Sequence, residues 1–221
     1  MVKNRVVVLF SGGIDSTTLL YQLGAEGVVV YPIIFFYGQR HSKELLAARE
    51  TCKKLGIGLE EVNLEALGRL APSALTEEGI EVPRVGYSEG SMRNTYVPNR
   101  NMVFLSFAAS YAIGKGIRSI CYAAHGGDHA LYPDCRPEFI SAMEEAIRLC
   151  SYDEVGLEVP YIYWNKADIV RRGVELGVDY SLTWSCYQGG DLACGKCGTC
   201  VERLEAFAEV GVKDPIVYER S

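Results

Sequence analysis

Hydrophobic positions along the chain alternate between short uninterrupted runs and longer stretches with helical spacing. Residues 5–10 (RVVVLF) form a run of strand length without polar alternation, which is typical of a strand covered on both faces in a parallel sheet. Residues 15–23 then show helical spacing, and residues 28–36 return to an apolar run. This order predicts a β-α-β unit with two parallel strands.

The alternation continues through most of the chain. Helices are predicted over residues 42–55, 101–115, 137–149 and 166–176, and further strands over residues 59–64 and 119–124. Residues 66–100 are rich in Gly, Pro and charge, which indicates mostly loop. We therefore predict an α/β fold with a doubly wound, Rossmann-like parallel sheet whose ligands lie beyond the carboxyl ends of the strands. The character changes after Tyr180, so residues 1–180 are expected to form the main domain and residues 181–221 a small C-terminal subdomain.

Composition and charge narrow the functional class. The 221 residues are 48% hydrophobic and 23% charged, which excludes disorder for most of the chain. The net charge of -6 argues against a general affinity for nucleic acid, and no stable nucleic-acid partner is expected. No apolar run has the roughly 18 residues of a membrane helix, and the first residues lack signal-peptide features, so we expect no membrane association and a cytoplasmic location.

A glycine turn follows the first predicted strand. Residues 11–16 (SGGIDS) stand where backbone N–H groups and the positive end of a helix converge, which favours anion binding. The hydroxyls can donate to phosphate oxygens, and an intervening Mg²⁺ would reconcile the carboxylate with a phosphate. The candidate phosphate-binding residues are Ser11, Gly12, Gly13, Asp15, Ser16 and Thr17. The alternative is a purely structural tight turn in which Asp15 or Ser16 caps the helix. The turn matches neither the Walker loop nor the dinucleotide fingerprint.

Four cysteines near the end of the chain have the spacing of metal ligands. Cys186, Cys194, Cys197 and Cys200 lie within fifteen residues, among glycines that permit tight turns. Four thiolates suit tetrahedral Zn²⁺, and a site closed in this way would be structural. An iron–sulfur cluster is the main rival. The other cysteines, which are expected to be buried small hydrophobic residues, are Cys52, Cys121, Cys135 and Cys150.

Several motifs in order carry a resemblance to a known family. The SGGxDS turn resembles that of the pyrophosphate-loop ATPases, which use ATP to adenylate a carbonyl or carboxyl oxygen. With FFYGQRH at 35–41, YVPNRN at 96–101, YPDCRPEF at 132–139 and the cysteine tail, the chain resembles the 7-cyano-7-deazaguanine synthase (QueC) family over essentially its whole length. The resemblance implies an adenine nucleotide alpha hydrolase-like fold and structural zinc on the four cysteines. It also implies that 7-carboxy-7-deazaguanine and ammonia are converted to the nitrile with MgATP, through an adenylated carboxylate and an adenylated amide.

Position relative to the sheet suggests further site residues. Tyr37, Gly38 and Gln39 follow the second strand and are assigned to ATP, whereas His41 could face the ligand or begin a helix. Asp15 is a candidate catalytic residue. So are Arg100 and Lys166, whose charges could neutralise the α-phosphate, with a solvated surface position as the alternative.

The loop at residues 132–136 is predicted to contact the deazaguanine. Asp134 could accept from the ring N–H and exocyclic amine, Arg136 could bind the carboxylate, and Tyr132 could stack on the ring. Ordinary turn chemistry is the alternative. Cys135 could in principle act as a nucleophile, although the chemistry requires none.

Residues 125–129 have the sequence HGGDH, whereas the better-known family members have sequences similar to Asp-Tyr-Ser-Gly at this point. His125 and His129 are candidate substrate-site residues that could bind metal or move protons, or they could belong to a flexible loop. The departure leaves the final step open, because the enzyme could instead stop at the amide or pass the acyl group to another amine, including a protein. A homodimer is expected. A tRNA-modifying relative and a non-catalytic nucleotide-binding module are the remaining rivals.

Overall fold

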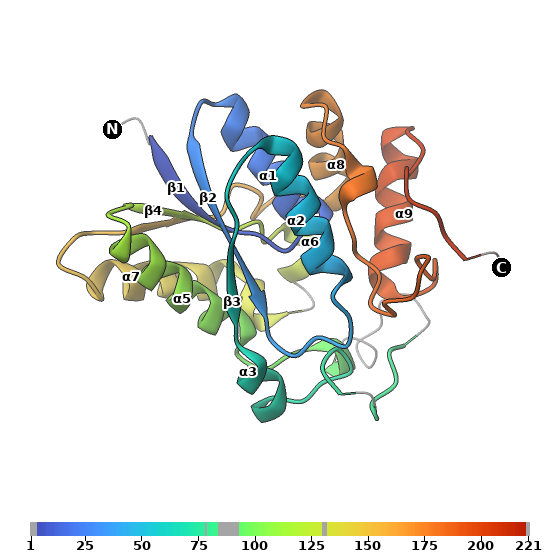
Figure 1. The fold of residues 1–221 in the computed structure, drawn as a ribbon, viewed down its shortest axis with the longest axis horizontal. Helices are drawn as coiled ribbons and strands as arrows, with labels where there is room; N and C mark the ends of the chain where they lie inside the picture. Colours follow the sequence, from blue (N-terminus) through green and yellow to red (C-terminus); the bar gives the residue numbers. More distant parts are fainter. Residues whose placement is uncertain (1–3, 78, 84–92, 130–131, 220–221) are drawn as a thin grey trace.

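The computed structural model describes residues 4–77, 79–83, 93–129 and 132–219, with only the backbone described for Asp128 and His129. Its centre is a sheet of five parallel strands in the order β3-β2-β1-β4-β5 (Figure 1). The strands are β1 (Arg5–Leu9), β2 (Val29–Phe36), β3 (Glu60–Asn63), β4 (Ser119–Cys121) and β5 (Gly156–Glu158). The predicted parallel α/β fold is therefore confirmed.

Helices connect the strands, and most lie close to their predicted positions. They are α1 (Ile14–Ala25), α2 (Lys43–Leu55), α3 (Glu65–Leu70), α5 (Arg100–Gly114), α6 (Gly126–His129), α7 (Pro137–Leu149), α8 (Lys166–Glu175) and α9 (Gly198–Val210), with short 3₁₀ turns at Pro133–Cys135 and Tyr180–Leu182. The sequence did not predict α3, α6, α9 or β5. The region read as loop thus contains α3, and the cysteine segment continues into a helix.

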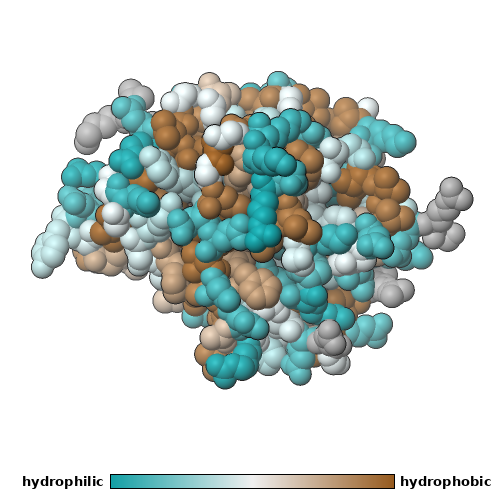
Figure 2. Space-filling view, in the orientation of Figure 1, coloured by the Kyte–Doolittle hydropathy of each residue, from teal (hydrophilic) through white to brown (hydrophobic). Residues whose placement is uncertain are grey.

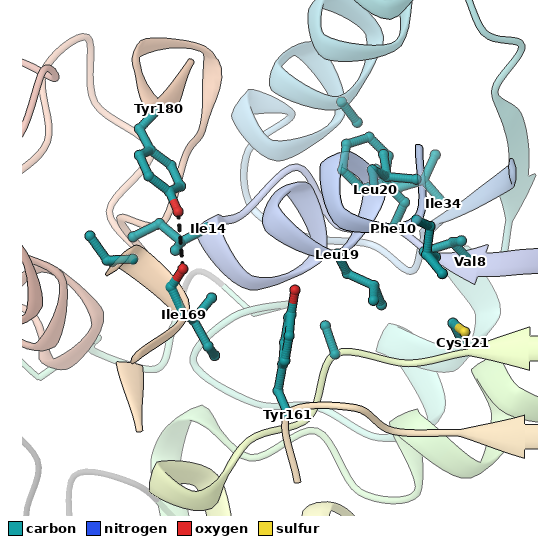
Figure 3. Packing of buried hydrophobic residues seen from close by; sticks show 14 of the residues in the cluster. Val8, Phe10, Ile14, Leu19, Leu20, Ile34, Cys121, Tyr161, Ile169 and Tyr180 are labelled. Atoms are coloured by element: carbon teal, nitrogen blue, oxygen red, sulfur yellow. Dashed lines mark hydrogen bonds between the residues drawn. The ribbon is translucent and has the colours of Figure 1, made fainter. Parts of the chain in front are cut away.

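The two faces of the sheet are covered by different helices. Val6 and Val8 of β1 belong to a core formed with α1, α2, α8 and α9, whereas Val7 and Leu9 belong to a core formed with α5 and α7. Successive side chains of a strand point to opposite faces, so β1 contributes to both cores. Figure 3 shows the first core, where Leu19 and Leu20 pack near Phe10 and the Tyr180 hydroxyl donates to the Ile169 carbonyl.

The first core is continuous across the predicted domain boundary. Ala206 and Phe207 of α9 belong to the same cluster as Leu19 and Val170 of the main domain. The C-terminal segment is therefore packed into the core of the α/β domain. The division of the chain at residue 181 stays a prediction.

The outer surface mixes polar and apolar side chains. Figure 2 shows hydrophilic and hydrophobic residues interspersed over one face of the molecule. Cys52, Cys121 and Cys135 are buried as predicted, but the prediction for Cys150 is wrong because this residue follows the last turn of α7 at the surface and is exposed. Among the residues that the structure describes, no helix has both the length and the hydrophobicity needed to cross a membrane.

Candidate active site

A cavity of about 260 Å³ lies at the carboxyl ends of β1, β2 and β4. β1 is flanked by β2 and β4, so the chain reverses its direction of travel across the sheet between β1 and β4. Loops diverge at such a switch point and leave a crevice, where open α/β sheets bind their ligands. The cavity lining includes Ser11, Gly13, Asp15, Ser16, Tyr37, Gln39, His41, Glu44, Arg100, Tyr132, Lys166, Trp184, Tyr187 and Glu202.

The glycine turn forms the floor of this cavity. Gly13 is the N-cap of α1 and has extended backbone angles, so the first turn of the helix directs its N–H groups outward. Ser16 Oγ accepts from Ser11 N at 3.1 Å and lies 3.0 Å from Ser11 Oγ. Because Gly13 is the N-cap of α1, neither Asp15 nor Ser16 caps the helix as the structural alternative had proposed. The turn can therefore receive an anion.

Gly12 fixes the turn against α2. It has a φ of 76°, and a Cβ at this position would lie 2.5 Å from Glu44 O and 2.9 Å from Ala48 N. Side chains with L chirality rarely adopt such a φ. The glycine thus allows the backbone to turn sharply and α2 to approach it closely.

Charged side chains from three helices meet beside the turn. Lys166 Nζ, at the start of α8, donates to Asp15 Oδ2 at 2.7 Å and lies 3.4 Å from Glu202 Oε2 of α9. Burial alone would raise the pKa of Asp15, but the charges of Lys166 and then His125 outweigh it and hold this pKa below its ordinary value. Burial raises the pKa of Glu202, with Lys166 opposing. Asp15 is therefore an ionised carboxylate at the edge of the cavity.

A second charged group also lines the cavity. Arg100 Nη1 donates to the Tyr37 hydroxyl at 3.2 Å, and the guanidinium lies 5.6 Å from the centre of the Tyr37 ring. Burial raises the pKa of Glu44 to about 7, although Arg100 opposes the shift. Arg100 and Lys166 both line the cavity, and only 14% of the Lys166 side chain is exposed. This placement rules out the solvated alternative for Lys166 and brings both cations to the same cavity.

The four C-terminal cysteines converge on one point. Their sulfur atoms all lie within 4.8 Å of one another, and Cys194 Sγ is 3.9 Å from Cys200 Sγ. A tetrahedron with metal–sulfur bonds of about 2.3 Å has edges of about 3.8 Å, so the cluster has the dimensions of a metal site. Backbone N–H groups of Gln188 and Cys194 donate to Cys186 Sγ. The cluster can therefore bind a metal ion.

The cysteine segment also contacts the glycine turn. Trp184 N donates to Gly12 O at 3.0 Å, and the His41 ring packs against Gly189, which lies between the first two cysteines. α9, which supplies Glu202, has Cys197 as its N-cap and Cys200 in its first turn. The cluster thus supports one side of the cavity.

Comparison with known proteins identifies the family. A family profile described as "Queuosine biosynthesis protein QueC" matches residues 5–211. A 7-cyano-7-deazaguanine synthase of Caldicellulosiruptor bescii is 56% identical over 215 residues, covering 97% of this chain and 97% of that protein. The chain belongs to the QueC family. Another 7-cyano-7-deazaguanine synthase, from Hahella chejuensis, is 50% identical over 220 residues, covering 99% of this chain and 95% of that protein.

Solved structures share the fold of this QueC family member. The NMN synthetase of Francisella tularensis superposes with a TM-score of 0.56 at 12% identity, over 96% of this chain and 79% of that protein. A 4-thiouridine synthetase, solved with RNA and bound ATP, gives 0.55 at 19% identity, over 94% of this chain and 51% of that one. At these identities the likeness concerns the fold alone.

Several residues predicted for the QueC site lie elsewhere. Gly12 faces α2, and Thr17 is buried behind the turn. Gly38 shapes the turn after β2 with a φ of 84°. Gln39 does line the cavity, and it also closes this turn by accepting from Tyr37 N at 2.7 Å and donating to Phe35 O. His41 lines the cavity and immediately precedes the Ser42 cap of α2, so both of its proposed positions hold.

The predicted substrate loop is only partly in the cavity. Tyr132 and Cys135 line it, whereas Asp134 and Arg136 are absent from the described lining. Asp134 is buried and accepts from the Asn101 backbone N–H at 3.3 Å, so its carboxylate caps the start of α5. Arg136 is the exposed N-cap of α7. His125 is buried, and the side chain of His129 lies outside the described residues.

Sequence reasoning missed two acidic residues of the cavity. Glu44 lies in the first turn of α2, three residues after the FFYGQRH motif, so helix phasing could have placed it at the rim. Glu202 follows the last cysteine by two residues, but only the docking of α9 on α8 brings it to Lys166. No local signal in the sequence indicates that contact.

Proposed function

We propose that this chain is an ATP-dependent carbon–nitrogen ligase that converts 7-carboxy-7-deazaguanine and ammonia to 7-cyano-7-deazaguanine. The observation that carries the proposal is 56% identity over nearly the full length to a 7-cyano-7-deazaguanine synthase. The cavity supports it, because it combines an anion-binding turn, two inward cations and aromatic walls in one space.

ATP is proposed to bind with its phosphates on the glycine turn. The N–H groups that begin α1 and the Ser11 and Ser16 hydroxyls would donate to phosphate oxygens. Asp15 is the candidate Mg²⁺ ligand, because its Oδ1 has no hydrogen-bond partner among the described residues. A bound Mg²⁺ would supply charge neutralisation at the leaving pyrophosphate.

The chemistry then requires positioning more than covalent catalysis. The substrate carboxylate attacks the α-phosphorus and pyrophosphate leaves, while Arg100 and Lys166 stabilise the developing charge. Ammonia adds to the acyl carbon, loses a proton and expels AMP, which gives the amide. The amide oxygen then attacks the α-phosphorus of a second ATP, a second pyrophosphate leaves, and an N–H proton is lost. Departure of AMP with the remaining N–H proton leaves the nitrile.

The aromatic side chains of the cavity, Tyr132 above all, are the proposed binding surface for the deazaguanine ring. Tyr132 is held by its hydroxyl, 3.2 Å from Thr95 Oγ1, and presents a face for stacking. Asp134 and Arg136 would reach a substrate only if the turn at 132–136 rearranged on binding. In the arrangement described, Asp134 instead supports the helix that carries Arg100.

Zinc is the proposed occupant of the cysteine cluster, because four thiolates in a closed tetrahedral site suit Zn²⁺. The ion would stabilise residues 184–202 against the ATP turn and take no part in the reaction. A homodimer and a cytoplasmic location stay predictions, and sedimentation analysis would test the first.

The decisive experiment is mass analysis of products after incubation with 7-carboxy-7-deazaguanine, ammonia and MgATP. The nitrile with two AMP per molecule is expected. The amide with one AMP, or a conjugate with another amine, would replace the final step but keep the adenylation. Unchanged substrate and no pyrophosphate, with protein that still binds its metal, would refute the ligase assignment. Omitting ammonia is the matched control.

A further inference from the structure

Glu44 differs from the other acidic residues of the cavity because its side chain has no partner. It lies in the first turn of α2 and lines the cavity, where part of its surface stays accessible. The carboxylates of Asp15 and Glu202 lie 2.7 and 3.4 Å from Lys166 Nζ. Among the residues that the structure describes, the Glu44 carboxyl makes no hydrogen bond and no ion pair. It is therefore the acidic group of the cavity that is open to a ligand.

Arg100 is the charge that acts on the Glu44 carboxyl. Burial raises the pKa of Glu44 to about 7, and the guanidinium opposes that shift. Both side chains line the cavity, but within the described chain they form no ion pair of 4.0 Å or less. The guanidinium has five N–H groups, and its one hydrogen bond to a described residue goes to the Tyr37 hydroxyl. An arginine and a glutamate held apart in one cavity can receive a ligand that offers both acceptors and donors.

Aromatic rings adjoin this pair of charged residues. Phe104 lies one turn after Arg100 on α5. Its ring stacks on Phe35 with centroids 4.4 Å apart, and its centroid lies 5.4 Å from that of Tyr37. All three rings line the cavity together with Tyr132, the ring proposed above for stacking. A flat heterocycle can pack on such a surface while its polar edge meets the charged groups.

The 7-carboxy-7-deazaguanine ring presents its polar groups in an order that suits this pair. The 7-carboxylate lies beside the 6-oxo oxygen, and the N1–H and the 2-amino group follow along the same edge. The first two groups accept hydrogen bonds, which a guanidinium donates, and the last two donate, which a carboxylate accepts. An adenine ring has an acceptor at N1 beside its single 6-amino donor, so it complements a carboxylate less well.

We propose that Glu44 determines specificity for the guanine-like ring: its carboxylate accepts from the N1–H and the 2-amino group, while Arg100 donates to the 6-oxo oxygen and the adjacent 7-carboxylate. This inference rests on the proposed function, from which it takes the substrate. Arg100 then lies beside the carboxylate that attacks the α-phosphorus, in keeping with its proposed role in the reaction. Two N–H donors favour the ionised form of Glu44, so the ring offsets the cost of burying that charge.

The test is calorimetric titration of the purified full-length protein with 7-carboxy-7-deazaguanine, in the presence of α,β-methylene-ATP, which cannot release pyrophosphate. Glu44→Gln keeps the size of the side chain but replaces one acceptor oxygen with an N–H group that faces a donor of the ring. Glu50→Gln is the matched control, because it removes the same charge from an exposed position of α2. We expect Glu44→Gln to bind the substrate about 10- to 100-fold more weakly, and Glu50→Gln to bind it like the wild type.

A second ligand separates recognition of the ring from a general loss of binding. 7-Carboxy-7-deazahypoxanthine lacks only the 2-amino group, so the wild type should bind it about tenfold more weakly than the substrate. Glu44→Gln should bind this analogue at least as tightly as the substrate, because its amide N–H no longer opposes a donor. Urea unfolding at pH 8 should show that Glu44→Gln is at least as stable as the wild type, so weaker binding is not loss of folding.

Titration with MgATP alone distinguishes the two heterocycles that could reach Glu44. Glu44→Gln should bind MgATP within about threefold of the wild type. Weaker MgATP binding with normal substrate binding would overturn the inference and assign Glu44 to adenine. Equal affinity of the wild type for the two deazapurines would also overturn it, without any variant, and so would equal weakening of both ligands by Glu44→Gln.

The same titrations separate this inference from the proposed function. A wild type that binds MgATP but not 7-carboxy-7-deazaguanine would refute the proposed function, and this inference with it. Substrate binding by the wild type that Glu44→Gln leaves unchanged would refute the role of Glu44 alone.

Discussion

Substitution of Gly12 by alanine tests whether the conformation of the glycine turn depends on its close contact with α2. The residue has a φ of 76°, and a Cβ would lie 2.5 Å from Glu44 O and 2.9 Å from Ala48 N. Gly56, at the end of α2, has a φ of 66° and open space around the same position. Both substitutions therefore introduce left-handed strain of about 1–2 kcal/mol, but only Gly12→Ala adds overpacking of about 1–3 kcal/mol. We expect Gly56→Ala to lose about 1–2 kcal/mol of stability and Gly12→Ala about 2–5 kcal/mol.

Urea unfolding followed by circular dichroism measures both losses, with unchanged m values as the check that only stability differs. Calorimetric titration with MgATP gives the functional readout. Gly56→Ala should bind like the wild type, whereas Gly12→Ala should bind at least tenfold more weakly, because relief of the clash moves the turn away from the phosphates. Equal destabilisation in the two variants, or normal MgATP affinity in Gly12→Ala, would show that the contact with α2 does not set the turn.

Three further predictions concern charge, metal and the C-terminal segment. Burial raises the pKa of Glu44 to about 7, so the folded state holds this proton more tightly than the unfolded state. Wild-type stability should therefore fall as the pH rises from about 4.5 through 7. At pH 8 the free energy of unfolding of Glu44→Gln should exceed that of the wild type by up to about 3 kcal/mol, whereas at pH 4 this gain should be absent. A difference that is the same at both pH values would contradict this. Cys197→Ser should lose most of the zinc that elemental analysis finds in the wild type, about one ion per chain, and should unfold more easily; iron in the wild type would exclude zinc as the occupant. Arg203 is 1% exposed and donates to both carboxylate oxygens of Asp214, at 2.7 and 2.9 Å. Replacing it with Met should lower the free energy of unfolding by about 3–5 kcal/mol, because the substitution leaves the Asp214 charge buried without its partner. A loss below about 1 kcal/mol in urea unfolding would refute its structural role.

The parts of the fold that were predictable are those specified by local sequence. β1, the glycine turn and α1 follow from a buried run, a break and a helical pattern in direct succession. β5 has only three residues, too few to show a period, and its place at the edge of the sheet depends on pairing with β4. The helical pattern of α9 begins inside the cysteine cluster, where the spacing of metal ligands dominates the sequence.

The site was predictable to the extent that it lies at the ends of strands. Tyr37 follows β2 directly, and Asp15 lies in the first turn of α1, after the glycine turn that follows β1. Topology alone brings both residues to one edge of the sheet. Side-chain direction beyond that edge depends on how helices begin and dock. Arg136 therefore faces outward at the start of α7 although its motif borders the cavity, and Glu202 enters the cavity although its segment lies at the opposite end of the chain.

The contact between Trp184 and Gly12 has a consequence for the order in which the protein is synthesised. The glycine turn is synthesised long before Trp184, whose backbone N–H braces it, and before Glu202, whose carboxylate belongs to the charged cluster. Lys166 and Asp15, which form the centre of the charged cluster, are 151 residues apart in sequence. A nascent chain thus exposes its glycine turn long before the residues of α8 and α9 that line the same cavity have been synthesised. The charged cluster beside the turn is therefore completed only after α9 has been synthesised and has packed against α8.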